Sequence, residues 1–203
     1  VEHHPDLVKQ MVSQGHEIGH HGYLHEAPAS LDAKQEEELL DKSLGIIEGL
    51  TKTKVVGNRS CSLDPSNRTL QLLADRDFIY DTSLLNADTP YFLDVGNDHK
   101  LVEVPTHWEI SDFPYFPYVP YWGMRSTLSS QEAVYSTWKQ AFDFLHAQGD
   151  TSFCLLTHPQ IIGRPSRLAM LENFIQYMQS YPTVQFMSMI NGVNVWKKNQ
   201  RKH

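Results

Sequence analysis

Apolar and polar positions along the 203-residue chain change their period repeatedly, and each change predicts a new element. Apolar residues three and four positions apart predict helices, whereas short apolar runs predict strands. The predicted helices cover residues 6–14, a long stretch from residue 32, and residues 65–76, 129–148 and 166–181. The predicted strands cover residues 16–21, 55–59, 78–80, 101–104, 152–157 and 184–189. This repeated strand–helix order favours a parallel α/β sheet or barrel.

Local signals support several of these elements. Asp32 with Gln35, and Ser129 with Glu132, have the spacing of capping boxes, in which two side chains satisfy the free N–H groups at a helix start. The run over residues 152–157 is apolar almost throughout, which is typical of a strand buried on both faces.

One long connection, over residues 106–128, interrupts the alternation. Loops of this length are usually functional or disordered, and a high aromatic content argues against disorder. The aromatic residues are Trp108, Phe113, Tyr115, Phe116, Tyr118, Tyr121 and Trp122. Two interpretations stay open: a packed surface loop or subunit interface, and a wall of a substrate pocket.

Composition predicts one globular domain and excludes some classes of function. Hydrophobic residues make up 40% of the chain, and the formal net charge is −7. A nucleic-acid partner is not expected, because phosphate contacts need clustered lysine and arginine, which are absent outside the C-terminal tail. No run of 18 apolar residues predicts a membrane span. No leader opens the chain, so a cytoplasmic location is expected, with a signal that precedes Val1 as the alternative. Cys61 and Cys154 lie in unrelated contexts and do not suggest a disulfide.

Histidines are concentrated near the start of the chain. Two pairs have a four-residue spacing: His16 with His20, and His21 with His25. Neutral imidazole is a good ligand for zinc, so either pair could bind a metal. Gly22 follows the first histidine of the second pair and indicates a strained turn where the backbone approaches another group closely.

Four short sequence blocks stand out along the chain. They are GHEIGHHGYLHE at residues 15–26, Asn58-Arg59-Ser60, VEVPTHWEISDFPYF at residues 102–116, and LLTHPQIIGRPSR at residues 155–167. They resemble the second to fifth motifs of NodB-type polysaccharide deacetylases, which are carbohydrate esterase 4-like proteins. The resemblance implies a distorted (β/α) barrel that forms a single domain over residues 1–203. It also implies a first motif with two aspartates, which should precede Val1, so the barrel is expected to lack its first strand or strands.

The resemblance assigns roles to individual residues. It implies that His21 and His25 bind a divalent metal, most simply zinc, and that His158 is the general acid that protonates the leaving nitrogen. Arg59 would hold a catalytic aspartate ionised. Gly22 stands where the family usually has Ser or Thr, which is similar to the branch of peptidoglycan deacetylase-like and allantoinase or cyclic-imide hydrolase-like proteins.

The fourth block implies pocket-wall and charge-tuning residues. These substrate-binding candidates are Trp108, Asp112, Tyr115 and Phe116. Each also has a simpler interpretation, because tryptophan in a proline-rich loop often only packs and Asp112 could cap a turn. Cys61 stands about where the family has proline, and with no base identified beside it we do not expect a nucleophile.

The expected activity is metal-dependent hydrolysis of a non-peptide carbon–nitrogen bond. The substrate would be an N-acetylated glycan or a small linear or cyclic amide. A non-catalytic relative that binds carbohydrate through the aromatic connection is the alternative, and self-association into a homo-oligomer stays open.

Overall fold

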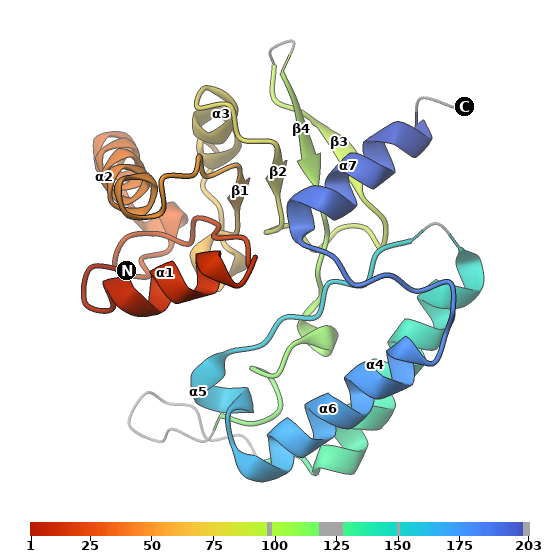
Figure 1. Cartoon of the computed structure of the whole chain (residues 1–203). Coiled ribbons are helices and arrows are strands. Elements are labelled where there is room, and N and C mark those ends of the chain that lie inside the picture. Colours follow the sequence, from red (N-terminus) through yellow and green to blue (C-terminus); the bar gives the residue numbers. More distant parts are fainter. Residues whose placement is uncertain (97–98, 118–127, 150, 201–203) are drawn as a thin grey trace. The chain divides into compact units, whose positions relative to one another are not determined.

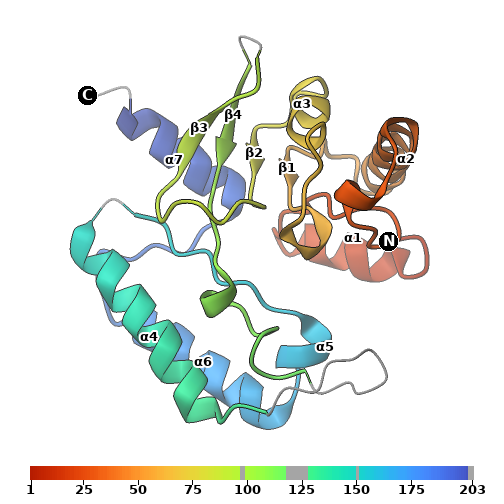
Figure 2. The same cartoon turned by 180° about the vertical axis from the view of Figure 1, so that it is seen from behind.

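The computed structural model describes residues 1–96, 99–117, 128–149 and 151–200. Tyr118, Tyr121 and Trp122 of the aromatic connection lie outside the described residues. The chain divides into two compact units: the first comprises Val1–Pro105 with the segment that starts at Met187, and the second comprises Thr106–Phe186 (Figures 1 and 2). Each unit has its own core, and the expectation of a single domain stays a prediction.

Short strands and longer helices alternate through most of the first unit. Its helices are α1 (Pro5–Ser13), η1 (Pro28–Ser30), α2 (Ala33–Thr51), η2 (Cys61–Leu63), α3 (Thr69–Ala74) and α7 (Met189–Gln200). Its strands are β1 (Gly57–Asn58), β2 (Tyr80–Asp81), β3 (Tyr91–Asp94) and β4 (Lys100–Glu103). The second unit contains η3 (Trp108–Ile110), α4 (Gln131–Gln148), α5 (Pro159–Ile162) and α6 (Pro165–Gln179).

The strands form one sheet in the order β1-β2-β4-β3. Strands β1, β2 and β4 run parallel, as the strand–helix order predicts, while β3 pairs antiparallel with β4. His20 extends the sheet beyond β1 through an isolated parallel bridge to Asn58. The predicted strand over residues 16–21 is therefore reduced to this single bridge.

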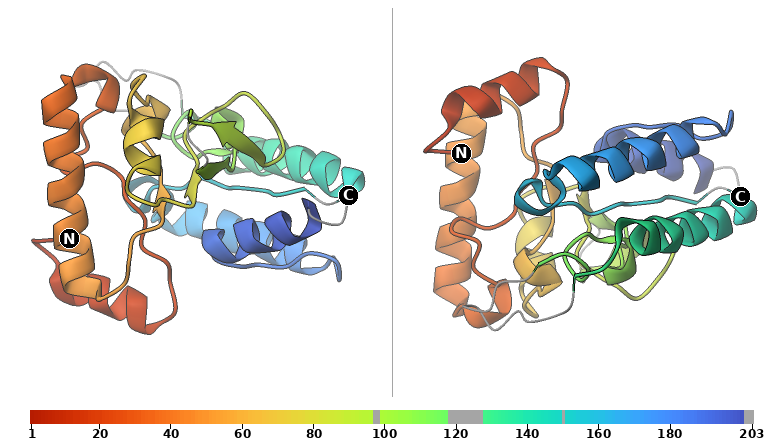
Figure 3. Two further views of the ribbon diagram at one scale, coloured as in Figure 1. Left: turned by 90° about the horizontal axis from the view of Figure 1, so that it is seen from above. Right: turned by 90° about the horizontal axis from the view of Figure 1, so that it is seen from below.

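Helices cover both faces of this sheet (Figure 3). On one face, Leu40 and Ile47 of α2 join Leu73 of α3 in a core with Phe78 and Leu101. The opposite face carries α7, whose packing residues join those of β2 and β4: Val193, Met189, Ile190, Trp196, Tyr80 and Val102. Burial of apolar surface on both faces is what holds such short strands in place.

The start of α2 confirms the capping box predicted from sequence. The Asp32 side chain accepts a hydrogen bond from the N–H of Gln35, and the Gln35 side chain accepts one from the N–H of Asp32. Lys52 is the C-cap of α2, and its φ of 58° places it in the left-handed region. Among the described residues, no helix is long and apolar enough to cross a membrane.

Helices α4 and α6 lie side by side in the second unit, and their contact forms its core (Figure 1). Trp138 of α4 and Phe174 of α6 are both fully buried, with ring centroids 5.9 Å apart. The N-cap of α4 is Ser130, whose side chain accepts from the N–H of Ala133, so the predicted cap at Ser129 is wrong by one residue.

Two predicted strands are also wrong. Residues 152–157 form no strand, and among the residues that the structure describes they make a single bridge, between Leu156 and Ser111. Residues 184–188 form no strand, and Met189 instead begins α7. Helix α7 was not predicted because it contains glycine, asparagine and valine, which are weak helix formers. Packing against the sheet overrides that weak preference.

Candidate active site

The loop after residue 20 brings His21 and His25 together in the first unit. Their ring centroids are 5.0 Å apart and their planes cross at 83°. His25 has a φ of 66°, in the left-handed region, where a non-glycine residue is uncommon and often marks a functional site. The structure does not pair His16 with His20 in this way, because the buried ring of His20 is turned toward Asn58.

A backbone contact fixes the ring orientation of His21. Its Nδ1 lies 2.6 Å from the carbonyl oxygen of Arg59, and since a carbonyl can only accept, Nδ1–H donates. The lone pair is then on Nε2, the atom left for a cation. Desolvation of the ring lowers the pKa of His21, so the neutral form that a metal requires is favoured.

Gly22 is required by the geometry of this turn. Its φ is 77°, and a Cβ built on it would lie 2.9 Å from Sγ of Cys61 and 3.6 Å from the carbonyl oxygen of Glu26. Any side chain there would meet both backbone strain and a clash. The strained turn and close approach expected from the sequence are confirmed.

Arg59 lies directly after β1 and makes hydrogen bonds to His20 and Thr82. Its N–H donates to the carbonyl oxygen of His20 at 3.0 Å. Its guanidinium donates to the carbonyl oxygen and to Oγ1 of Thr82, at 3.2 and 3.1 Å. These contacts make the guanidinium rigid, and its expected role toward a catalytic aspartate stays a prediction.

A row of buried polar side chains crosses the sheet, and sequence reasoning missed it. The register aligns His20, Asn58, Asp81 and Glu103 as neighbours on adjacent strands. Nδ1 of His20 lies 2.7 Å from Oδ1 of Asn58, and Nδ2 of Asn58 donates to Asp81 at 2.6 Å. A polar residue directly after each short apolar run was the signal that could have revealed this row.

Two carboxyl groups in this row are fully buried. Burial, with the charge of Asp81 as the next cause, raises the pKa of Glu103 to about 9. Burial raises the pKa of Asp81 as well. One oxygen of Glu103 accepts from the N–H of Leu84, and among the described residues the other has no hydrogen-bond partner. A neutral Glu103 is consistent with that, because an unpartnered buried oxygen costs far more when it carries charge.

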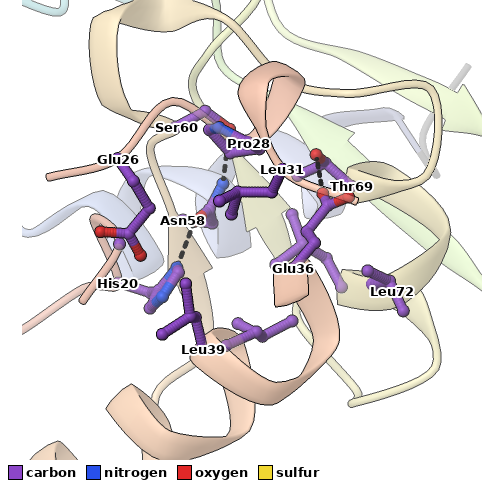
Figure 4. A pocket seen from close by; sticks show the side chains of 13 residues that line it. His20, Glu26, Pro28, Leu31, Glu36, Leu39, Asn58, Ser60, Thr69 and Leu72 are labelled. Carbon is purple, nitrogen blue, oxygen red and sulfur yellow. Dashed lines mark hydrogen bonds between the residues drawn. The ribbon is translucent and has the colours of Figure 1, made fainter. Parts of the chain in front are cut away.

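His20 also lines a small pocket (Figure 4). Its volume is about 30 Å³, and Glu26, Glu36, Ser60 and Thr69 are among its lining residues. Within the described part of the chain, Nε2 of His20 makes no hydrogen bond. The volume suits a water molecule or two at that nitrogen, and it is far too small for a sugar ring.

His158 and Asp112 form a tight pair within the second unit. Nδ1 of His158 lies 2.6 Å from Oδ1 of Asp112, and the N–H of His158 donates to Oδ2 at 2.9 Å. The bridge between Ser111 and Leu156 aligns the two segments, and the side chain of Asp112 is fully buried whereas that of His158 is 23% exposed. Asp112 therefore fixes the tautomer with Nδ1–H and leaves Nε2 of His158 for chemistry.

The aromatic candidates of this unit have different surroundings. Trp108 is 39% exposed, and the hydroxyl of Tyr115 donates to the carbonyl oxygen of Glu109 at 2.9 Å. Phe116 is only 2% exposed and lies under the guanidinium of Arg167. A buried ring offers no surface to a substrate, so the expected substrate contact of Phe116 is corrected to a core position.

Both cysteines are buried free thiols. Burial raises the pKa of Cys61 to about 11, so with no cation bound the thiol form is favoured.

These features define an α/β protein with a parallel sheet and a histidine-rich loop at a strand end. A family model described as polysaccharide deacetylase matches residues 1–80. Peptidoglycan deacetylase of Helicobacter pylori is 30% identical over 227 residues, which cover all of this chain and 78% of that protein.

Solved structures agree with this similarity. A polysaccharide deacetylase family member from Mycobacterium smegmatis superposes with a TM-score of 0.91 at 29% identity, covering 98% of this chain and 69% of that one. Puue allantoinase superposes with a TM-score of 0.82 at 27% identity, covering 97% of this chain and 64% of that one. The chain belongs to the polysaccharide deacetylase family, and its relatives indicate a hydrolase of amide carbon–nitrogen bonds. The expected NodB-type fold class is thereby confirmed.

Proposed function

We propose that this chain is a metal-dependent N-deacetylase of N-acetylated glycans, with peptidoglycan as the substrate class. The observation that carries the proposal is the convergence of His21 and His25 in a chain of this family. The similarity to a peptidoglycan deacetylase supports the choice of substrate.

The donor chemistry fits a divalent cation, and zinc is the proposed ion. His21 and His25 would hold it through imidazole nitrogens, which suit zinc, and the carbonyl of Arg59 orients one of the two rings. When bound, such a cation acts as a Lewis acid toward the amide carbonyl.

His158 is the proposed general acid for the departing nitrogen. Its Nε2 delivers a proton while Asp112 stabilises the ring through Nδ1–H. Both oxygens of Asp112 already accept hydrogen bonds from His158. Asp112 is therefore suited to orienting the acid and not to activating water.

A second candidate is hydrolysis of a small amide, by an allantoinase-like reaction. The superposition on Puue allantoinase supports it, at a sequence identity close to that of the deacetylase family member. Both reactions would use the same proposed roles for His21, His25 and His158. They differ in the product released.

The two candidates are separated by product analysis. Acetate release from peptidoglycan and from N-acetylglucosamine oligomers supports the first, and ring opening of allantoin or a cyclic imide without acetate release supports the second. His158→Ala should lower kcat by about a hundredfold, the usual effect of losing a general acid, without changing metal content. His146→Ala is the matched control, because His146 lies on α4 and contacts Thr183. Activity of His158→Ala within about threefold of wild type would make His158 structural.

Metal content gives an independent test. Changing His21 and His25 to alanine should abolish binding of zinc, whereas His16→Ala, in the loop just before, should leave it intact. Equal stoichiometry in all three proteins would contradict the assignment of the metal to this loop.

A further inference from the structure

A third donor lies beside the two histidines. Side-chain donor atoms of His21, His25 and Cys61 all lie within 4.8 Å of one another. Among the described residues, this is the one group of three His, Cys, Asp or Glu side chains close enough together to hold a metal ion. Cys61 is fully buried at the start of η2, so its sulfur is held in one environment. Imidazole and thiolate together form a donor set that binds zinc tightly.

The backbone fixes the position of this sulfur. Three contacts connect the histidine loop to the segment after β1: Arg59 N–H to the carbonyl oxygen of His20 at 3.0 Å, Nδ1–H of His21 to the carbonyl oxygen of Arg59 at 2.6 Å, and Sγ of Cys61 to the carbonyl oxygen of His21 at 2.8 Å. The absence of a side chain at Gly22 leaves room for Sγ, because a Cβ there would lie 2.9 Å from it. These contacts therefore keep the thiol of Cys61 facing the histidine loop.

The spacing is close to that of a metal site. Ligand bonds of about 2.0–2.3 Å around tetrahedral zinc put neighbouring donors about 3.3–3.7 Å apart. The donors here lie within 4.8 Å, so a shift of about 1 Å, within reach of side-chain rotation, would bring them to bonding positions.

We infer that Cys61 is a sulfur ligand of the cation bound by His21 and His25. The inference rests on the proposed metal site and specifies its donor set. On binding, the S–H bond of Cys61 breaks, its electron pair forms the sulfur–metal bond, and the proton passes to water. The hydrogen bond to the carbonyl oxygen of His21 is given up. A thiolate ligand makes the site select zinc, cobalt and cadmium over magnesium and manganese, which prefer oxygen.

Cobalt(II) substitution tests this inference without an activity assay. Titration of the full chain with cobalt(II) should produce a sulfur-to-cobalt charge-transfer band in the near ultraviolet. Cys61→Ser should still bind cobalt through the two histidines, but without that band and with at least tenfold weaker affinity, the scale expected for losing a metal-site group. Cys154→Ser is the matched control, since Cys154 is the other buried thiol and lies in the second unit. Its spectrum should equal that of the wild type.

The outcomes separate this inference from the proposed function. Cobalt that binds the wild type with no charge-transfer band, or a band that survives Cys61→Ser, overturns the sulfur ligand and leaves the histidine site intact. Absence of any cobalt or zinc binding overturns both. X-ray absorption of the zinc-loaded wild type needs no variant: a sulfur neighbour at about 2.3 Å supports the inference, and a shell of nitrogen and oxygen alone refutes it.

Discussion

The buried carboxyl pair predicts how stability should depend on pH. Glu103 has its pKa raised to about 9 by burial and by Asp81, against an ordinary value of 4.5 in the unfolded chain. A group whose pKa is higher in the folded state stabilises the fold fully below the unfolded pKa, and that contribution is lost as the pH rises through the folded pKa. Stability should therefore fall between pH 4.5 and about pH 9 because of this one proton.

The size of the effect follows from proton linkage. Where the folded state holds one proton that the unfolded state lacks, the free energy of unfolding falls by about 1.4 kcal/mol for each pH unit. From about pH 6 to about pH 8 the loss amounts to roughly 3 kcal/mol, a large part of the 5–15 kcal/mol typical of a domain. Glu103→Gln keeps an acceptor for the N–H of Leu84 but cannot titrate, so it should not show this loss.

Urea unfolding of wild type and Glu103→Gln across this pH range measures the difference. The free energies of unfolding should diverge in favour of the variant as the pH rises, with a slope near 1.4 kcal/mol per unit. Glu172→Gln, an exposed position on α6, is the control and should follow the wild type. Parallel curves for wild type and Glu103→Gln would refute a neutral Glu103.

Three further predictions concern other positions. Asp112→Asn should lower kcat by about a hundredfold or more, because an amide can hold His158 in the wrong tautomer. Metal content and fold should not change. Steady-state kinetics together with circular dichroism checks this, and a kcat near that of the wild type would contradict it. Gly22→Ala should destabilise the fold by about 1–2 kcal/mol from the left-handed backbone alone, whereas Gly45→Ala, with open space on α2, should stabilise it by about 0.5–1 kcal/mol. Thermal melts compare the two glycine variants, and equal shifts would exclude the strained turn. Asp32→Ala should cost about 1 kcal/mol in urea unfolding by removing the helix cap, and no loss would mean that solvent replaces it.

Local signals predicted the elements whose cause is local. The Asp32–Gln35 capping box, the helix predicted over residues 166–181 and the strained glycine at residue 22 all follow from neighbours in the sequence, and the structure has each of them. Helix α7 was missed because its stability comes from packing on the sheet and not from its composition.

In the candidate site, too, contacts between near neighbours in the sequence could be predicted and contacts between distant residues could not. The spacing of His21 and His25 within one loop is visible in the sequence, and the structure brings their rings together. The contact of Asp112 with His158 joins residues 46 positions apart, and the neighbours Asp81 and Glu103 are separated by 22 residues. Without the strand register, no periodicity places such residues beside each other.

The contact between Gly22 and Cys61 makes the two positions depend on each other. A side chain at residue 22 meets the sulfur of Cys61, so its cost should shrink when that sulfur is removed, while the backbone part of the cost remains. In evolutionary terms the two sites are epistatic. A descendant of this protein should tolerate Ser or Thr at residue 22 more readily once the sulfur at residue 61 is gone, and we expect the residues at these two positions to change together among relatives.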